Sequence, residues 1–185
     1  MSSFRHLGDE AVHHGYLWHV VVADFEAPDG ERFRRDIVRS PGSVGVVPLV
    51  FDAEGVASVV LVRQYRHPVR DWTLEVPAGS VNDGERPLAA AQRELAEEVG
   101  GSGGAWRHLT TFFSSSAHLS LRSDAFLATG VEVGPPRPDA EEELTVVRLP
   151  VAEALERARR GQVVEGQTAL CLRLAAVHLD GARSS

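Results

Sequence analysis

Two neighbouring segments, 43–51 and 57–65, are apolar at nearly every position, and the short polar turn DAEG lies between them. Continuous apolar runs of this length are typical of strands that are buried on both faces. The pattern therefore predicts two adjacent strands at the centre of a sheet.

Shorter β-rich segments surround this pair. Segments 16–25 and 32–39 flank the turn APDGE, whose Pro, Asp and Gly favour a hairpin. Further strands are expected at 71–79, 107–116, 123–133 and 144–150, with the polar loop SSSAHLSL between the second and the third.

Three segments have the patterns of helices. Segment 87–99 starts with Pro87, which suits a first helical turn, and Gly100 follows it, which suits a helix end. Segments 151–162 and 166–179 come last, the first amphipathic and the second largely apolar. Strands dominate and the helices do not alternate regularly with them, so the expected class is α/β (mixed), a mixed sheet with helices packed against it.

The first predicted helix has two distinct faces. Leu88, Leu95 and Val99 recur on one stripe at 3.6 residues per turn, and this stripe is expected to dock on the sheet. Another face, well away from the stripe, is expected to carry the acids Glu94, Glu97 and Glu98. Like charges three and four residues apart repel by roughly 0.2–0.5 kcal/mol per pair, so this crowding needs a reason.

The amino-acid composition restricts which partners the chain can bind and which catalytic groups it can use. The chain has 185 residues and a net charge of -7, and all nineteen of its basic residues are arginine. An acidic chain lacks a broad attraction to nucleic acid or to an anionic membrane, so neither is expected as a partner. Because there is no lysine, a P-loop lysine and a Schiff base are excluded, and arginine, backbone amides or metal must contact any phosphate.

Cysteine content and the length of the apolar segments bear on the compartment. Cys171 is the single cysteine, and it is expected to be a buried helical thiol, which excludes a disulfide scaffold. No segment approaches the ~20 apolar residues of a membrane span, and residues 1–25 lack a basic region followed by an apolar one. Cytoplasmic residence is therefore expected.

A spaced set of glycine, acidic and basic residues includes the first predicted helix. From residue 79 it reads Gly, five residues, Glu, seven residues, Arg-Glu-Leu, one residue, Glu-Glu, one residue, Gly. This spacing resembles the Nudix box, the signature of the Nudix hydrolases. Gly101 is the one departure, because the family usually has an aliphatic residue there, and it is expected to weaken a packing contact while leaving the chemistry intact.

Beyond the box, the chain resembles ADP-ribose pyrophosphatases and related nucleoside-diphosphate-sugar hydrolases. The similarity covers residues 16–180 and includes LVRQYRHPVRDWTLEVPAG upstream and AEEELTVVRLPVAEALERARRGQ downstream. It implies a Nudix fold, a mixed β-sheet between helices with an N-terminal antiparallel β segment. The resemblance also implies a division into a 1–42 β segment, expected to be the dimerisation element of a homodimer, a 43–180 hydrolase domain and a 181–185 tail.

The spacing of the acids suits a divalent metal. Glu94 and Glu98 are one helical turn apart, which places their carboxylates about 5–6 Å apart, and Glu97 lies beside them and assists. Hard ions take oxygen ligands, so we predict a site for Mg²⁺ and a diphosphate, with Mn²⁺ as a substitute. Gly79 is expected to let the loop turn tightly, so that the main-chain carbonyl of Ala78 approaches the ion.

Arg93 is expected to have an orienting role. On the predicted helix it points off the acidic face and toward Glu85, and pairing with Glu85 would fix the preceding loop to the helix. In the family, the matching glutamate and arginine do this work.

Three residues upstream of the box are candidate substrate contacts. Arg63 and Arg66 lie near the end of a predicted strand, and the resemblance together with the absence of lysine favours a phosphate or ribose contact by one of them. The alternative is that both are solvent-facing strand charges. Glu75 is either a substrate or metal-shell ligand or an acid of an edge strand.

The acidic loop DAEEEL precedes the last predicted strand. In isolation three acids here would form a solvated turn. In the resembling subfamily a glutamate of this loop closes over the metals and activates or positions water, and alignment on Leu144 favours Glu142, then Glu141, as the base.

These features predict a Mg²⁺-dependent hydrolase that cleaves a nucleoside diphosphate linked to a group X. ADP-ribose, giving AMP and ribose 5-phosphate, and a nucleotide sugar are the leading substrates. The loop SSSAHLSLRSD lacks the proline and glycine of many ADP-ribose pyrophosphatases, so X stays open. The alternatives are hydrolysis of nucleoside triphosphates, dinucleoside polyphosphates or capped RNA ends, and a non-catalytic domain that binds nucleotide sugars.

Overall fold

The computed structural model describes residues 3–137 and 143–183, and within them it has ten strands and three helices. In chain order they are β1 (Arg5–His14), β2 (His19–Glu26), β3 (Arg32–Arg39), β4 (Ser43–Phe51), β5 (Ala57–Arg66), β6 (Asp71–Glu75), β7 (Ala78–Ser80), α1 (Pro87–Val99), β8 (Gly101–Phe113), β9 (Arg122–Val133), β10 (Leu144–Pro150), α2 (Val151–Arg159) and α3 (Gly166–Arg183).

The main sheet has seven strands with β4 and β5 at its centre. Its order is β10-β5-β4-β9-β8, with β6 added to β5 and β7 added to β4. The pairing of β4 with β9 is parallel and the other pairings are antiparallel, so the sheet is mixed. The mixed class and the central position of the two most apolar segments are confirmed.

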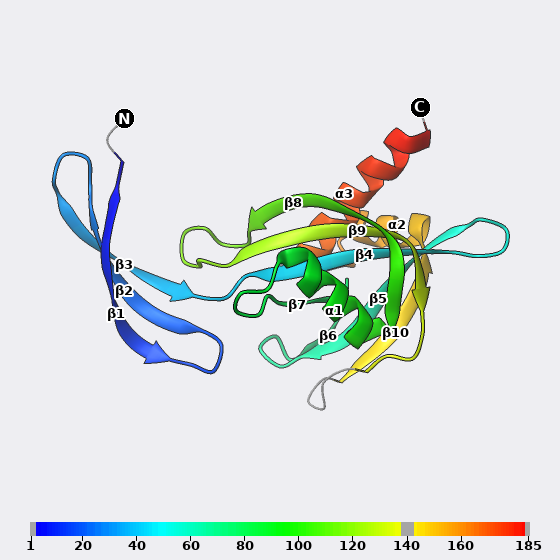
Figure 1. The fold of residues 1–185 in the computed structure, drawn as a ribbon, viewed down its shortest axis with the longest axis horizontal. Helices are drawn as coiled ribbons and strands as arrows, with labels where there is room; N and C mark the ends of the chain where they lie inside the picture. Colours follow the sequence, from blue (N-terminus) through cyan, green and yellow to red (C-terminus); the bar gives the residue numbers. More distant parts are fainter. Residues whose placement is uncertain (1–2, 138–142, 184–185) are drawn as a thin grey trace.

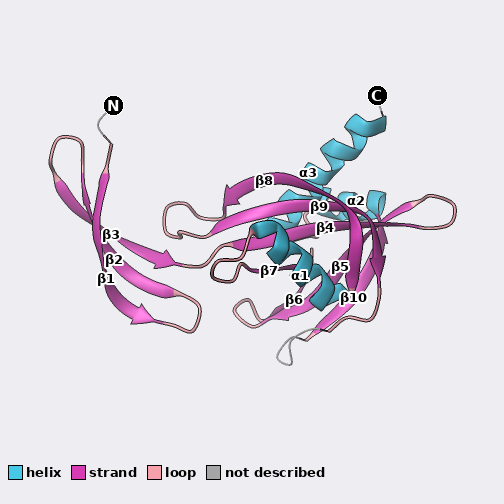
Figure 2. Cartoon of the chain, in the orientation of Figure 1, coloured by secondary structure: helices cyan, strands magenta, loops and turns pink. Residues whose placement is uncertain are grey.

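Helices cover both faces of this sheet, as Figure 2 shows. Successive residues of a strand point to opposite faces, so β5 contributes to two cores. Val60 and Val62 pack with α1 residues, whereas Val59 and Leu61 pack with residues of α2 and α3. No helix in the described part of the chain is long and apolar enough to cross a membrane.

The first three strands form a separate antiparallel sheet at one end of the molecule (Figure 1). Its contact with the main body includes β3, because the Val38 amide donates to the His118 carbonyl at 2.8 Å and the Ser120 amide donates to the Val38 carbonyl at 3.0 Å. The loop after β8 therefore helps to hold the small sheet in place.

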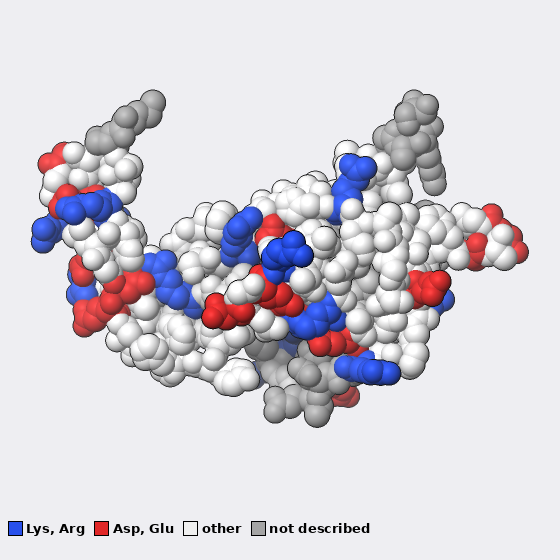
Figure 3. Space-filling model, viewed as in Figure 1, with Lys and Arg blue, Asp and Glu red and all other residues white. Residues whose placement is uncertain are grey.

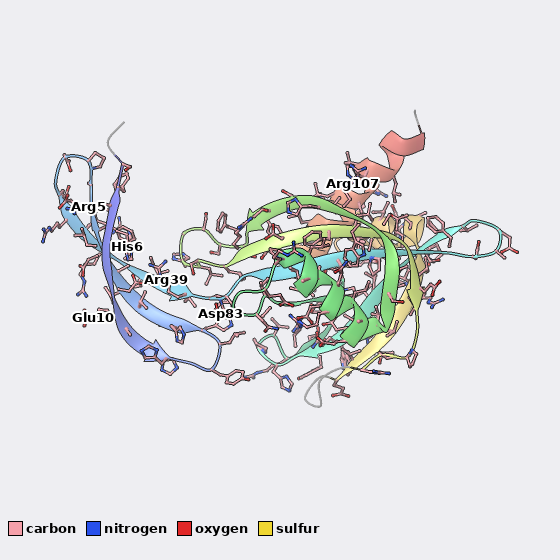
Figure 4. All side chains as sticks on the ribbon, viewed as in Figure 1. Arg5, His6, Glu10, Arg39, Asp83 and Arg107 are labelled. Carbon is pink, nitrogen blue, oxygen red and sulfur yellow. The ribbon has the colours of Figure 1, made fainter. Side chains whose placement is uncertain are left out.

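Strand β1 was not expected from the sequence. Its residues RHLGDEAVHH do not alternate between apolar and polar side chains, and they are exposed at nearly every position. Ion pairs across the small sheet support it instead, including Arg5 with Glu26 and Arg39 with Asp9. Figure 4 labels Arg5, His6, Glu10 and Arg39 on this sheet. The strand expected at 16–25 is also shorter, since β2 begins only at His19.

The segment expected as one strand at 71–79 is two strands. Strand β6 pairs with β5 and strand β7 pairs with β4, so the chain moves from one neighbour to the other within a few residues. Pro77 lies at the crossing, where its carbonyl accepts a hydrogen bond from the Val46 amide at 2.9 Å. This crossing brings Ala78 and Gly79 next to α1, which contacts β7.

The bounds of α1 are as predicted, with Pro87 in the first turn and Gly100 in the left-handed conformation (φ 65°) at the C-cap. The predicted docking stripe is partly wrong, because Leu88 is 40% exposed while Leu95 and Val99 are fully buried. Small side chains complete the buried face, since Ala90 and Ala91 let the helix approach the sheet closely.

Gly101 is required by the packing of Leu95. A Cβ added at Gly101 would lie 2.5 Å from the Leu95 Cγ, so the leucine side chain occupies the volume that an aliphatic residue would fill. The expected loss of a packing contact at this position is therefore compensated within the helix.

Cys171 is fully buried in α3, as predicted, and burial raises the pKa of its thiol to about 12. Because the thiolate is the reactive form, we expect the native protein to react with iodoacetamide at pH 8 about a hundred-fold more slowly than the urea-unfolded chain. Mass spectrometry of timed samples checks this. Equal labelling rates in the two states would contradict the burial.

Candidate active site

A cavity of about 510 Å³ lies beside α1, where elements from several parts of the chain meet. Its walls come from the β1–β2 turn, β4 to β7, the loop before α1, α1 itself and the start of α3. The lining residues are Tyr16, Ser43, Val44, Arg66, Glu75, Ala78, Gly79, Ser80, Asn82, Arg93, Glu94, Glu97, Glu165 and Gln167.

Two of the three box acids are buried between α1 and β7. Glu98 is 2% exposed, and its Oε2 accepts a hydrogen bond from the Ala78 amide at 3.2 Å. Glu94 is 9% exposed and lies against Gly79, where an added Cβ would be 2.0 Å from its Oε1. The expectation that these acids lie well away from the docking stripe is wrong, because Glu94 and Glu98 share the buried side of the helix with Leu95.

Gly79 acts through close approach rather than through a tight turn. It lies within β7 and is not among the glycines with positive φ. The absence of a side chain is what allows the Glu94 carboxylate to rest on the backbone of β7, which corrects the reason expected from the sequence.

Arg93 joins the loop before α1 to the acids on the helix. Its Nε and Nη2 donate to Glu85 at 3.2 and 3.1 Å, and Nη2 also donates to the Ser80 carbonyl at 2.8 Å. The predicted pairing with Glu85 is present. The expectation that Arg93 points off the acidic face is wrong, because Nη1 donates to Glu94 at 2.7 Å and to Glu97 at 3.0 Å.

The electrostatics of this cluster follow from those contacts. The hydrogen bond with Glu85, followed by those with Glu94 and Glu97, raises the pKa of the Arg93 guanidinium, and the same contact lowers the pKa of Glu85. One cation thus offsets the repulsion between neighbouring acids. In Figure 3 acidic and basic residues are accordingly interspersed around α1 on the face shown.

Arg66 and Glu75 form a second ion pair at the cavity. Arg66 Nε and Nη2 donate to the two carboxylate oxygens of Glu75 at 2.8 and 2.6 Å, and the Thr73 hydroxyl donates to Glu75 as well. Burial of Glu75 raises its pKa, but the hydrogen bonds from Arg66 and Thr73 outweigh burial and hold the pKa below its usual value. Glu75 is therefore a buried anion that fixes the position of the Arg66 guanidinium.

Arg63 lies on the opposite side of the sheet from Arg66. Its register partner is Leu74, which packs against the core under α2 and α3, whereas Glu75 faces α1 beside Val62. The Arg63 guanidinium stacks on Trp72 at 4.5 Å from the ring centroid, and Arg63 does not line the cavity. Of the two predicted arginines, the structure places only Arg66 at the cavity.

A NUDIX domain model matches residues 40–167 of the chain. The chain belongs to the NUDIX domain family. It is 34% identical over 177 residues to the CMP-5'-(N-acetyl-N-hydroxy-3-aminopropyl)phosphonate hydrolase of Streptomyces rubellomurinus, a match that covers 95% of this chain and 83% of that protein. It is 27% identical over 168 residues to the ADP-ribose pyrophosphatase of Bacillus subtilis, with 90% and 89% covered.

A solved structure shows the same fold over nearly the whole chain. The crystal structure of an ADP compounds hydrolase aligns with a TM-score of 0.80 and 26% identity, covering 97% of this chain and 95% of that one. The Nudix fold and the family that the box predicted are thereby confirmed. The protein is a Nudix hydrolase with ADP-ribose pyrophosphatase relatives, and this family acts on phosphoric anhydrides.

The predicted catalytic bases of this Nudix hydrolase, Glu141 and Glu142, lie outside the described residues. Arg137 and Glu143, which are described on the two sides of this stretch, each take part in a backbone hydrogen bond. The Arg137 amide donates to the Glu97 carbonyl at 2.7 Å, and the Tyr65 amide donates to the Glu143 carbonyl at 3.4 Å.

Several cavity residues were missed by sequence reasoning. Glu165 caps α3, since its carboxylate accepts hydrogen bonds from the Gln167 and Thr168 amides at 2.9 and 2.6 Å, and Gln167 in turn donates to the Val44 carbonyl at 3.2 Å. An acid just before an apolar helix was the available signal for the cap. Nothing in the sequence pattern indicates that Tyr16 and Ser43 lie at the same cavity.

The donor set suits a hard divalent ion, which Nudix hydrolases use. Glu94, Glu97 and the Ala78 backbone border one cavity, and Glu98 is bonded to that same backbone. Within residues 3–137 and 143–183, however, no group of three or more His, Cys, Asp or Glu is arranged as a complete metal site. Arg93 Nη1 donates to one oxygen each of Glu94 and Glu97, and so holds these two carboxylates on one side of the cavity.

Proposed function

We propose that this Nudix hydrolase cleaves the diphosphate bond of a nucleoside diphosphate linked to a second group, ADP-ribose or a nucleotide sugar. The observation that carries the proposal is the meeting of the box acids and Arg66 at one cavity of about 510 Å³. A cavity of this size accommodates a small-molecule ligand, and it offers an acidic wall for metal beside a cation for phosphate. The products from ADP-ribose are AMP and ribose 5-phosphate.

The relatives support this substrate class without fixing the base. One is named for ADP-ribose, one for a CMP-linked phosphonate, and the solved neighbour for ADP compounds. A nucleotide joined to a second group is common to the first two names, whereas the base differs. We therefore propose the class and leave the base to the measurement.

The metal ligands in this proposal are Glu94, Glu97, Glu98 and the main-chain carbonyl of Ala78. Mg²⁺, or Mn²⁺ in its place, when bound neutralises diphosphate charge and lowers the pKa of the attacking water. The carboxylates hold position through contacts already present, Glu98 on the Ala78 amide and Glu94 against Gly79. Arg93 orients Glu94 and Glu97 while it holds Glu85 and the loop before the helix.

Glu142, or else Glu141, is proposed as the general base that takes a proton from the attacking water. The hydrogen bond from the Arg137 amide to the Glu97 carbonyl supports a base from this loop, because it holds the described chain before the loop at α1.

Arg66 is the proposed phosphate contact, and Glu75 is the residue that positions it. The pairing with Glu75 fixes the guanidinium, which is partly exposed at the cavity and retains N–H donors for a substrate oxygen. Arg63 is left out of the substrate site because it stacks on Trp72 on the other side of the sheet.

A homodimer built through the 1–42 segment remains part of the proposal. Large apolar side chains are exposed on this segment, including Phe4, Val12, Tyr16 and Trp18, and such groups are common at protein interfaces. The family match begins at residue 40, which supports a boundary near residue 42. Sedimentation of the full chain and of a chain that starts at residue 43 tests the dimer and the boundary. We expect a dimer for the full chain and a folded monomer for the shorter one.

A turnover screen with Mg²⁺ tests the function. The panel contains ADP-ribose, nucleotide sugars with different bases, ATP, diadenosine tetraphosphate and a capped RNA end, with products separated by chromatography. We expect a nucleoside monophosphate and a phosphorylated second group from a member of the first two classes. Preferred cleavage of ATP, the dinucleotide or the capped RNA would support the alternative hydrolases, and calorimetric binding without cleavage would support a nucleotide-sugar-binding domain.

A further inference from the structure

Two histidines face each other at the end of the β1–β2 hairpin. His14 and His19 are directly opposite in the antiparallel register, both are exposed, and their Nδ1 atoms are 3.3 Å apart. Their ring centroids are 5.0 Å apart. The loop between them is closed by a hydrogen bond from the Gly15 amide to the Trp18 carbonyl at 2.8 Å, so the hairpin backbone fixes the spacing of the pair.

This spacing matches chelation of one metal ion by two imidazoles. Metal–nitrogen bonds of about 2.0–2.1 Å at a tetrahedral angle place the two nitrogens about 3.3–3.4 Å apart. A neutral imidazole in the Nε2–H tautomer presents a lone pair on Nδ1, so in that tautomer both rings can offer Nδ1 to one ion. A hydrogen bond between the two rings would use only one lone pair and would compete with water at this exposed position.

We propose that His14 and His19 form a binding site for a borderline transition-metal ion, Zn²⁺, Ni²⁺ or Cu²⁺, with water completing the coordination. Imidazole favours these ions, whereas the carboxylates at α1 favour hard ions such as Mg²⁺. The two sites therefore differ in ligand chemistry as well as in position. The proposal does not depend on the hydrolase activity.

The His14–His19 pair lies at the two ends of a short loop that also contributes to the cavity. Tyr16 lies in the loop between the two histidines and also lines the cavity. In Figure 1 the β1–β2 turn bends from the small sheet toward the main body. An ion that links His14 to His19 joins the two ends of this loop and restricts the motion of the segment that carries Tyr16.

Metal binding to the untagged full chain tests the proposal. Zn²⁺ or Ni²⁺ is titrated by calorimetry in excess Mg²⁺, which keeps the carboxylates occupied, and Cu²⁺ is examined by electron paramagnetic resonance. We expect one ion per chain and a superhyperfine pattern from two imidazole nitrogens. His14→Asn and His19→Asn should each weaken binding by about tenfold or more.

His13→Asn is the matched control, because His13 is exposed and adjacent but its register partner is Val20. It should retain the stoichiometry, the affinity and the two-nitrogen spectrum. Thermal unfolding with and without Zn²⁺ provides a second readout, since an ion that binds the folded state raises the melting temperature. Absence of binding in the unaltered chain, or unchanged binding after His14→Asn, would overturn the proposal.

Discussion

Glu98→Gln is expected to reduce turnover about a thousand-fold, equivalent to about 4 kcal/mol of transition-state stabilisation. Glu98 is a buried carboxylate bonded to the Ala78 amide, and the same stretch of backbone carries the carbonyl proposed as a metal ligand. Glutamine has the same length and can still accept this hydrogen bond, but it lacks the negative charge that a divalent ion needs. The loss should therefore appear in kcat and in the Mg²⁺ concentration required for half-maximal rate.

The thermal stability of the Glu98→Gln variant distinguishes a metal-binding role of Glu98 from a purely structural role. Burial of a neutral amide costs less than burial of a carboxylate, so the melting temperature without metal should not fall. Glu153→Gln is the control, because Glu153 is an acid on α2 that pairs with Arg157 away from the cavity. Unchanged turnover in Glu98→Gln, or an equal loss in Glu153→Gln, would rule out the proposed role of Glu98.

The central part of the fold was predictable because its signals are local. Strands β4 and β5 are nearly continuous apolar runs, and α1 begins at Pro87 and ends before a left-handed Gly100. The box spacing also identified the family and the Arg93–Glu85 pair, since both partners lie within a few residues of one helix end.

What the sequence did not predict depends on long-range packing. Strand β1 is held by cross-strand ion pairs such as that of Arg5 with Glu26, which leave no periodic pattern. Arg63 and Arg66 point to opposite faces of the sheet. Which face carries Trp72 and which carries Glu75 is set by the pairing of β5 with β6. A helical pattern places Glu94 and Glu98 on a polar face, and only the approach of β7 shows that this face is buried.

Gly79→Ala is expected to abolish most activity and to destabilise the fold by about 1–3 kcal/mol. The added Cβ would lie 2.0, 2.1 and 2.5 Å from Oε1, Cδ and Oε2 of Glu94, so the carboxylate cannot keep its position. Displacing it also breaks the contact of Glu94 with Arg93. Urea unfolding and kcat measure the two effects, and Gly8→Ala is the control because a Cβ there meets nothing within 4 Å.

The three atoms nearest to a Cβ added at Gly79 all belong to the Glu94 side chain, so a double-mutant cycle can test whether this contact accounts for the effect. Glu94→Ala removes the carboxylate and with it the clash. In that background Gly79→Ala should cost close to nothing in unfolding free energy, whereas it is costly in the unaltered chain. Additive costs would instead mean that the glycine is needed for the backbone of β7 itself, and the close approach of Glu94 would then not explain the first position of the box.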